Sequence, residues 1–86
     1  MYNYEDQKAE IFTDSGQRMF LAIRDKVAAC LKVSGAVRLM EATERCGGGD
    51  SWTMIACMDR MVELREIREI TDKVPGQYRV FVKVGE

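Results

Sequence analysis

Histidine is absent from the chain, proline occurs once, and the three cysteines are Cys30, Cys46 and Cys57. Without histidine, zinc would need an unusual set of ligands, and these spacings offer no nucleophile and base that act together. An odd number of widely spaced cysteines does not suit a disulfide framework and fits a reducing compartment better. We therefore expect no catalytic residues, no metal site and no cofactor, and we do not expect an enzyme.

Long apolar runs and blocks of like charge are missing as well. No stretch approaches the roughly 18 apolar residues that would suggest a membrane helix, and the polar, acidic start at 1–10 is unlike a signal peptide. The 13 Lys and Arg balance 14 Asp and Glu, so the net charge of −1 does not indicate a nucleic-acid-binding face. With 86 residues, 47% of them hydrophobic, the chain is expected to form one globular, cytoplasmic domain without membrane contact.

The first segment with a clear helical period is 13–32. The Thr13-Asp14-Ser15 segment is a good N-cap because short side-chain oxygens accept hydrogen bonds from the free N–H groups of a first turn. The apolar residues that follow, at the spacing of one buried helix face, are Met19, Phe20, Ile23, Val27, Cys30 and Leu31.

Residues 1–12 are expected to form an N-terminal arm ahead of a domain that spans 13–86. The apolar residues of this arm are Tyr2, Tyr4, Ile11 and Phe12. The two tyrosines would cover the edge of the core or supply a dimer contact. Ile11 and Phe12 would pack on the core of the domain itself.

A shorter helix is expected after Ser34-Gly35, with Val37 on its apolar face, and it ends near Arg45. Gly47–Gly49 then form a loop, because three glycines cost too much backbone entropy in a helix. The adjacent Cys46 is expected to be exposed. No strand precedes these glycines and no Lys-Ser or Lys-Thr follows them, so they do not make a phosphate-binding loop.

A third helix is expected over 51–64, capped by Asp50 and Ser51. The side expected to pack on the core carries Trp52, Ile55, Met58 and Val62, flanked by Met54 and Met61. The opposite side carries Thr53, Ala56, Cys57 and Arg60. The cysteines within helical patterns, Cys30 and Cys57, are interpreted as buried or half-buried small hydrophobic side chains.

The C-terminal part predicts a β-hairpin, with strands at 67–71 and 77–84. By the two-residue period, one face carries Tyr78, Val80, Val82 and Val84, and the other carries Arg79, Phe81 and Lys83. A lone hairpin is only marginally stable in water, so this one is expected to lie on the helices with Tyr78, Val80 and Val82 facing them and Phe81 outside. Pro75 and Gly76 suit the turn, since proline fixes φ at one central position and glycine tolerates a positive φ at the next.

These segments together resemble the winged helix-turn-helix superfamily. Residues 13–32 resemble its first helix, 38–43 its second helix, 51–64 its third helix, 65–70 the entry into its wing and 77–84 the return strand. The resemblance implies an α+β fold in which a three-helix core carries a C-terminal β-hairpin wing. It rests on a pattern of apolar positions over about three quarters of the chain.

The resemblance also implies a function, that of a small transcriptional regulator that binds double-stranded DNA. The third helix would lie in the major groove and the wing would contact the backbone. The residues that would face the groove are Ser51, Thr53, Ala56, Cys57 and Arg60. The residues that would contact DNA from the wing are Lys73, Gln77 and Arg79.

A second hypothesis keeps the winged-helix shape without DNA binding. The near-neutral charge, the aromatic arm and an exposed Phe81 favour a protein–protein interaction module. The interface would then include Tyr2, Tyr4 and Phe81, and the partner would be another protein or a second copy of the chain. The sequence leaves both hypotheses open.

Overall fold

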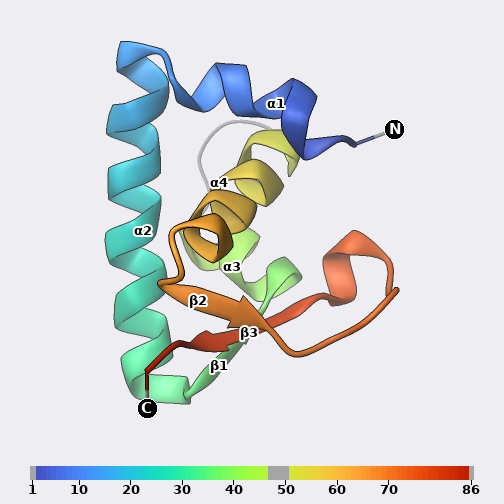
Figure 1. Cartoon of the computed structure of the whole chain (residues 1–86). Coiled ribbons are helices and arrows are strands. Elements are labelled where there is room, and N and C mark those ends of the chain that lie inside the picture. The colour runs from blue at the N-terminus through green and yellow to red at the C-terminus, as the bar shows by residue number, and fades with distance from the viewer. Residues whose placement is uncertain (1, 47–50, 86) are drawn as a thin grey trace.

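Four α-helices and three strands make up the described part of the chain, which comprises residues 2–46 and 51–85 of a computed structural model (Figure 1). The helices are α1 (Tyr4–Ile11), α2 (Asp14–Ser34), α3 (Leu39–Cys46) and α4 (Ser51–Glu63). The strands are β1 (Ala36–Arg38), β2 (Ile67–Glu69) and β3 (Val80–Lys83), and a short 3-10 helix, η1 (Gly76–Tyr78), precedes β3. The α+β class expected from the sequence is therefore confirmed. None of the described helices is both long and apolar enough to span a membrane.

The N-terminal segment expected as an arm contains α1, which packs along α4 (Figure 1). Asn3 caps this helix, because its Oδ1 accepts a hydrogen bond from the backbone N of Asp6 at 3.3 Å. Ile11 is buried, as expected. The expectation that Phe12 packs in the core is wrong, because Phe12 lies where α1 ends and half of it is exposed. Its ring lies instead under the guanidinium group of Arg60, 4.9 Å away.

α2 begins at the predicted cap, where the Thr13 hydroxyl accepts from the backbone N of Gly16 at 3.0 Å. A Cβ on Gly16 would lie 2.0 Å from the carbonyl oxygen of Glu10, so the close approach of α1 requires glycine here. The helix ends at Ser34, and Gly35 follows in the left-handed conformation with φ of 79°. The predicted buried face is confirmed at Phe20, Ile23, Val27 and Leu31.

The second helix starts later than predicted, because residues 36–38 form β1. β1 pairs antiparallel with β3, where Val37 lies opposite Phe81. β2 pairs with the other edge of β3, so the sheet order is β1-β3-β2. A three-residue strand whose partner lies far along the chain leaves no local pattern, which explains why the sequence predicts only a two-stranded hairpin.

In the middle of β3 the two faces are the reverse of the prediction, whereas Lys83 is exposed as expected. Phe81, expected outside, is fully buried, whereas Val80 and Val82, expected against the helices, are only half-buried. The alternation is correct, but a period of two does not determine which set faces inward. Burying a phenyl ring removes more apolar area from water than burying a valine, and the buried Val37 lies opposite Phe81. Tyr78 lies in η1 and is exposed.

The turn at Pro75 and Gly76 differs from the predicted form. The backbone N of Tyr78 donates to the Pro75 carbonyl at 2.9 Å, and that of Arg79 donates to the Gly76 carbonyl at 3.2 Å. These bonds make one turn of 3-10 helix. Gly76 does not adopt the positive φ expected of it.

α4 contributes to the core through a face that is rotated from the predicted one: Met58 is buried as expected, but Ile55 and Val62 are only half-buried. The residues buried at the spacing of one helix face are Met54, Cys57, Met58 and Met61. Trp52, expected in the core, is 42% exposed, so this expectation is wrong. The apolar residues of α4 form two overlapping stripes, and the contacts with α1 and α2 decide which stripe is buried. The rest of the core comes from α2 and from Ile11, Val37, Leu39, Ala42, Cys46, Ala56, Ile67 and Phe81.

The cysteine expectations have mixed outcomes. Cys57 is buried and Cys30 is half-buried, as expected. The expectation that Cys46 is exposed is wrong, because it is the last residue of α3 and packs against α2. The predicted loop at Gly47–Gly49 and the predicted cap at Asp50 lie outside the described residues.

Candidate interaction surface

α1 lies along the side of α4 that faces away from the sheet (Figure 1). The Tyr2 hydroxyl donates to Asp59 Oδ2 at 2.6 Å, and the Tyr4 hydroxyl donates to Glu63 Oε1 at 2.8 Å. Lys8 Nζ pairs with Glu63 Oε2 at 2.7 Å. Both tyrosines that were predicted to contact another protein therefore bind α4 of their own chain.

These contacts shift the pKa values of the groups that make them. Hydrogen bonds from Lys8, Tyr4 and Arg60 lower the pKa of Glu63 to about 2. Burial and the hydrogen bond to its carboxylate partner raise the pKa of the Tyr2 hydroxyl well above its ordinary value. The same two causes raise the pKa of Tyr4. Both hydroxyls therefore stay protonated and act as donors at neutral pH.

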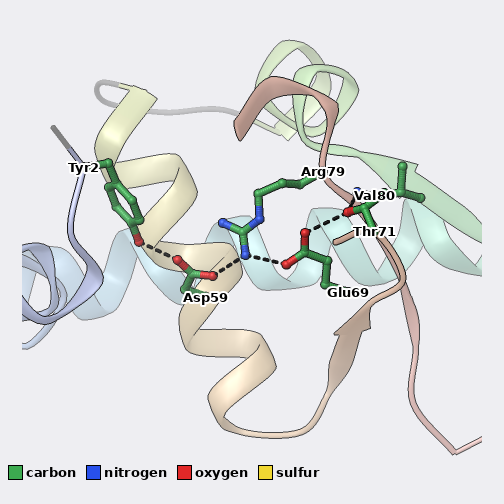
Figure 2. A network of polar contacts seen from close by, with 6 residues as sticks. All are labelled: Tyr2, Asp59, Glu69, Thr71, Arg79 and Val80. Carbon is green, nitrogen blue, oxygen red and sulfur yellow. Dashed lines mark hydrogen bonds and ion pairs between the residues drawn. The ribbon is translucent and has the colours of Figure 1, made fainter. Parts of the chain in front are cut away.

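On the other side of Asp59, the side chain of Arg79 bridges α4 and the sheet. Arg79 Nη2 lies 2.7 Å from Asp59 Oδ1 and 2.9 Å from Glu69 Oε1. The Thr71 hydroxyl completes the contact, donating to Glu69 Oε2 at 2.7 Å and accepting from the backbone N of Val80 at 3.1 Å. Figure 2 shows this polar chain, which joins Tyr2, Asp59, Arg79, Glu69, Thr71 and Val80.

The position of Arg79 explains its electrostatics. Its side chain is 18% exposed, and its guanidinium group also lies 5.1 Å from the centre of the Phe81 ring. Burial alone lowers the pKa of Arg79, but the hydrogen bonds to Asp59 and Glu69 raise it overall. Burial alone raises the pKa of Glu69, and the hydrogen bonds from Arg79 and Thr71 lower it overall. The cation is thus neutralised by two carboxylates within the domain.

Two of the residues predicted to face a DNA groove lie in the core instead. Ala56 and Cys57 are buried, so the expectation that they project outward from α4 is wrong. The rotation of α4 toward its Met54 face turns them inward. Burial raises the pKa of the Cys57 thiol to about 11. Neither side chain is available to contact a base.

The other predicted DNA contacts are dispersed. Arg60 Nη1 is paired with Glu63 Oε1 at 2.6 Å, and Thr53 is half-buried. Lys73 and Gln77 are exposed in the connection that leads to β3. Arg79 follows them and is held in the polar chain described above. The side chain of Ser51 lies outside the described part of the structure.

An open hollow, here called the Trp52 groove, adjoins the polar chain. Its apolar lining consists of Tyr2, Leu39, Met40, Trp52, Ile55 and Val74, and its polar lining of Thr43, Glu44, Gln77 and Arg79. The edge of the Tyr2 ring meets the Trp52 ring, with centroids 6.3 Å apart and planes at 73°. α3, α4, η1 and the segment that precedes α1 thus meet around an aromatic pair, of which Trp52 is exposed.

Two large apolar residues of the groove are exposed, Trp52 and Met40, the second at 38%. Of the charged lining residues, Arg79 is neutralised, whereas Glu44 pairs with no described residue. The groove therefore offers an apolar floor with one unpaired negative charge at its rim. The sequence feature that indicates this groove is the second apolar stripe of α4. A helix with two apolar stripes can bury only one of them against a small core.

The described residues contain no group of three or more His, Cys, Asp or Glu side chains that could hold a metal ion. Comparison with known protein families, with curated proteins and with solved structures gives no match for this chain.

Proposed function

We propose that the chain is a winged helix-turn-helix domain that binds another protein through the Trp52 groove. The order of the elements supports the winged-helix assignment. α2, α3 and α4 follow one another as the three helices of the resemblance do, and β2 and β3 follow α4 as the strands of the wing. The groove carries the functional part of the proposal, because an exposed tryptophan and an exposed methionine that line the same hollow are typical of interaction sites.

The pairing of the arginines with carboxylates and the position of α1 over α4 favour a protein partner over duplex DNA. DNA binding depends on unpaired cations that replace the counterions of phosphates. On and beside α4, however, Arg60 and Arg79 are engaged by carboxylates. α1 also covers part of the outward side of α4, where it adds the acidic Glu5 and Asp6 to the domain.

In this proposal the partner presents an amphipathic helix, with apolar anchors and a basic residue beside them. Anchors at helical spacing would contact Trp52, Met40 and Ile55, and the thioether of Met40 adapts to side chains of different shapes. A lysine or arginine of the partner would pair with Glu44 at the rim. Tyr2 would stay in place, because its hydroxyl is already bonded to Asp59.

The test uses Trp52, the single tryptophan of the chain, as a fluorescent reporter. Two synthetic amphipathic helical peptides would be titrated, with the same leucine anchors and with either lysine or glutamate at the flanks. We expect a saturable blue shift of the emission with the lysine peptide. Because the Glu44 contact is a surface ion pair, the chain should bind the lysine peptide about two- to fivefold more tightly than the glutamate peptide.

Variants locate the binding site. Met40→Asp should abolish the shift, and Glu44→Lys should reverse the preference between the two peptides. Val33→Asp is the matched control, since Val33 is 88% exposed on α2 and does not line the groove. An equal loss of the shift in the Met40 and Val33 variants would overturn the proposal.

Two further measurements test whether duplex DNA or a second copy of the chain is the partner instead. Retardation of random duplex DNA in a gel at low salt, weakened by Arg60→Ala, Lys73→Ala or higher salt, would favour DNA as the partner instead. A dimeric mass in light scattering that becomes monomeric in Met40→Asp would favour a second copy of the chain.

A further inference from the structure

α2 and α3 bring two cysteines together that lie 16 positions apart in the chain. Cys30 Sγ and Cys46 Sγ are 3.8 Å from each other. Cys30 is half-buried in α2, and Cys46 is buried at the last position of α3. The third cysteine, Cys57, is buried in α4 and has no such partner among the described residues.

The two sulfurs are in van der Waals contact and are not bonded to each other. The sulfurs of a disulfide are about 2.05 Å apart, so they would have to approach each other by roughly 2 Å. Rotation of side chains provides much of this movement. Cys46 ends α3, and the terminal residue of a helix can adjust without breaking the turns before it.

We propose that Cys30 and Cys46 are a site of reversible oxidation, at which a hydroperoxide converts the two thiols into a disulfide. Cys30 reacts first because it is the thiol that reaches solvent. Its Sγ loses a proton and attacks one oxygen of hydrogen peroxide. The O–O bond breaks, hydroxide leaves and takes up the proton as water, and Cys30 becomes a sulfenic acid.

Cys46 completes the reaction. Its Sγ loses a proton and attacks Cys30 Sγ, so the S–S bond forms and the S–O bond breaks. The hydroxide that leaves takes up this second proton, so that one peroxide and two thiols give one disulfide and two waters. The two sulfurs together lose two electrons, which the peroxide gains. An added dithiol reverses the oxidation by thiol–disulfide exchange.

Burial and the contact with Cys30 raise the pKa of the Cys46 thiol to about 11. The rise agrees with the order set by burial, in which the half-buried Cys30 reacts first and the buried Cys46 acts as the second, resolving group. The positive charges of Lys26 and Arg45 partly offset this rise and favour the thiolate when Cys46 attacks.

The disulfide would connect α3 to α2. α3 also supplies Met40, Thr43 and Glu44 to the Trp52 groove, so oxidation would fix one wall of the groove. This consequence rests on the proposed function, whereas the oxidation itself does not.

The experiment treats the full chain with hydrogen peroxide, unfolds it, alkylates the remaining thiols and measures the intact mass. The wild type should lose the mass of two hydrogens and keep one alkylated cysteine, which peptide mapping should identify as Cys57. Addition of dithiothreitol should restore all three alkylations. Cys57→Ser should form the same internal disulfide, whereas Cys30→Ser and Cys46→Ser should form none.

Several results would overturn the proposal. These are an absence of reaction, a sulfinic acid on Cys30 with Cys46 still alkylated, a disulfide that involves Cys57, and disulfides only between two chains. Cys30→Ala serves as a second variant if Cys46→Ser fails to fold, because Cys30 is only half-buried.

Peptide titrations of the reduced and oxidised chain are a separate experiment. Equal binding there would remove the effect on the groove without affecting the disulfide, and absence of binding in both forms would remove the proposed function alone.

Discussion

The two sides of α4 are held by different forces. The inner side packs Met54, Cys57, Met58 and Met61 against α2 and the sheet. No polar or charged residue of the described chain is buried there. The outer side is held by hydrogen bonds and ion pairs, in which Asp59 and Glu63 bind Tyr2, Tyr4, Lys8, Arg60 and Arg79.

Because of this difference, the inner side of α4 provides most of the stability and the outer side is available for binding. Apolar packing on the inner side depends on shape and volume and is insensitive to pH and moderate salt. Polar contacts on the outer side are partly solvated, so each is worth less and responds to pH and salt. The outer side can therefore carry an open groove beside Trp52 without loss of the core.

The largest expected loss of stability follows from removing the buried ring of β3. Phe81→Ala should reduce the free energy of unfolding by about 3–5 kcal/mol, because it leaves a cavity beneath the sheet. Urea unfolding followed by far-ultraviolet circular dichroism measures this change.

Trp52→Ala is the matched comparison, since it removes an aromatic residue that is nearly half exposed. We expect a loss of about 1–2 kcal/mol, which combines partial burial with the edge contact to Tyr2. A larger effect for Trp52 than for Phe81 would contradict the contrast between the two sides of α4.

A loss smaller than that of Phe81→Ala is expected at the polar chain. Arg79→Ala leaves Asp59 and Glu69 without the cation that both bind, and it should cost roughly 2–3 kcal/mol as a lost charged hydrogen-bonding group. Arg68→Ala is the control, because Arg68 is exposed on β2 and pairs with no described residue, and it should stay within about 0.5 kcal/mol of the wild type. In the Asp59→Asn background, the Arg79 substitution should cost less. Equal costs in both backgrounds would show that the two side chains do not interact.

The same contrast explains which parts of the structure the sequence predicts. The buried face of α2 and its cap at Thr13 follow from a local period and a local hydrogen bond, and both are correct. The inner face of β3 depends on the partners that Phe81 finds on β1 and β2, which no local pattern contains. The inner face of α4 likewise depends on α1, a helix with weak apolar periodicity that the sequence does not predict.

The candidate site was harder to predict than the fold. A tryptophan in a small domain usually packs in the core. Trp52 is exposed because Met54 and Met61 lie on the face of α4 that is buried. The pairing of Arg79 with Asp59 joins residues that are distant in sequence and have no motif in common. The proximity of Cys30 and Cys46 also depends on how α3 packs on α2.

The smallest expected effect concerns Glu63 and depends on pH. Its carboxylate accepts from Lys8, Tyr4 and Arg60, which lowers its pKa to about 2, below the ordinary value of 4.5. A carboxyl with a lowered pKa in the folded state contributes stability above its unfolded pKa and loses that contribution as the pH falls through the folded value. The contribution of Glu63 should therefore be complete above about pH 4.5 and decline between pH 4.5 and 2.

Glu63→Gln tests this prediction because it keeps the shape of the side chain and removes the charge. The difference in unfolding free energy between wild type and variant should be constant near neutral pH and shrink as the solution becomes more acidic than pH 4.5. Glu5→Gln is the control, since Glu5 is exposed on α1 and has no described partner. Titration of the Glu63 carboxyl by NMR gives the pKa directly, and Tyr4→Phe should raise it by removing one donor. An ordinary carboxyl pKa at Glu63 would mean that α1 is not held against α4 by these bonds.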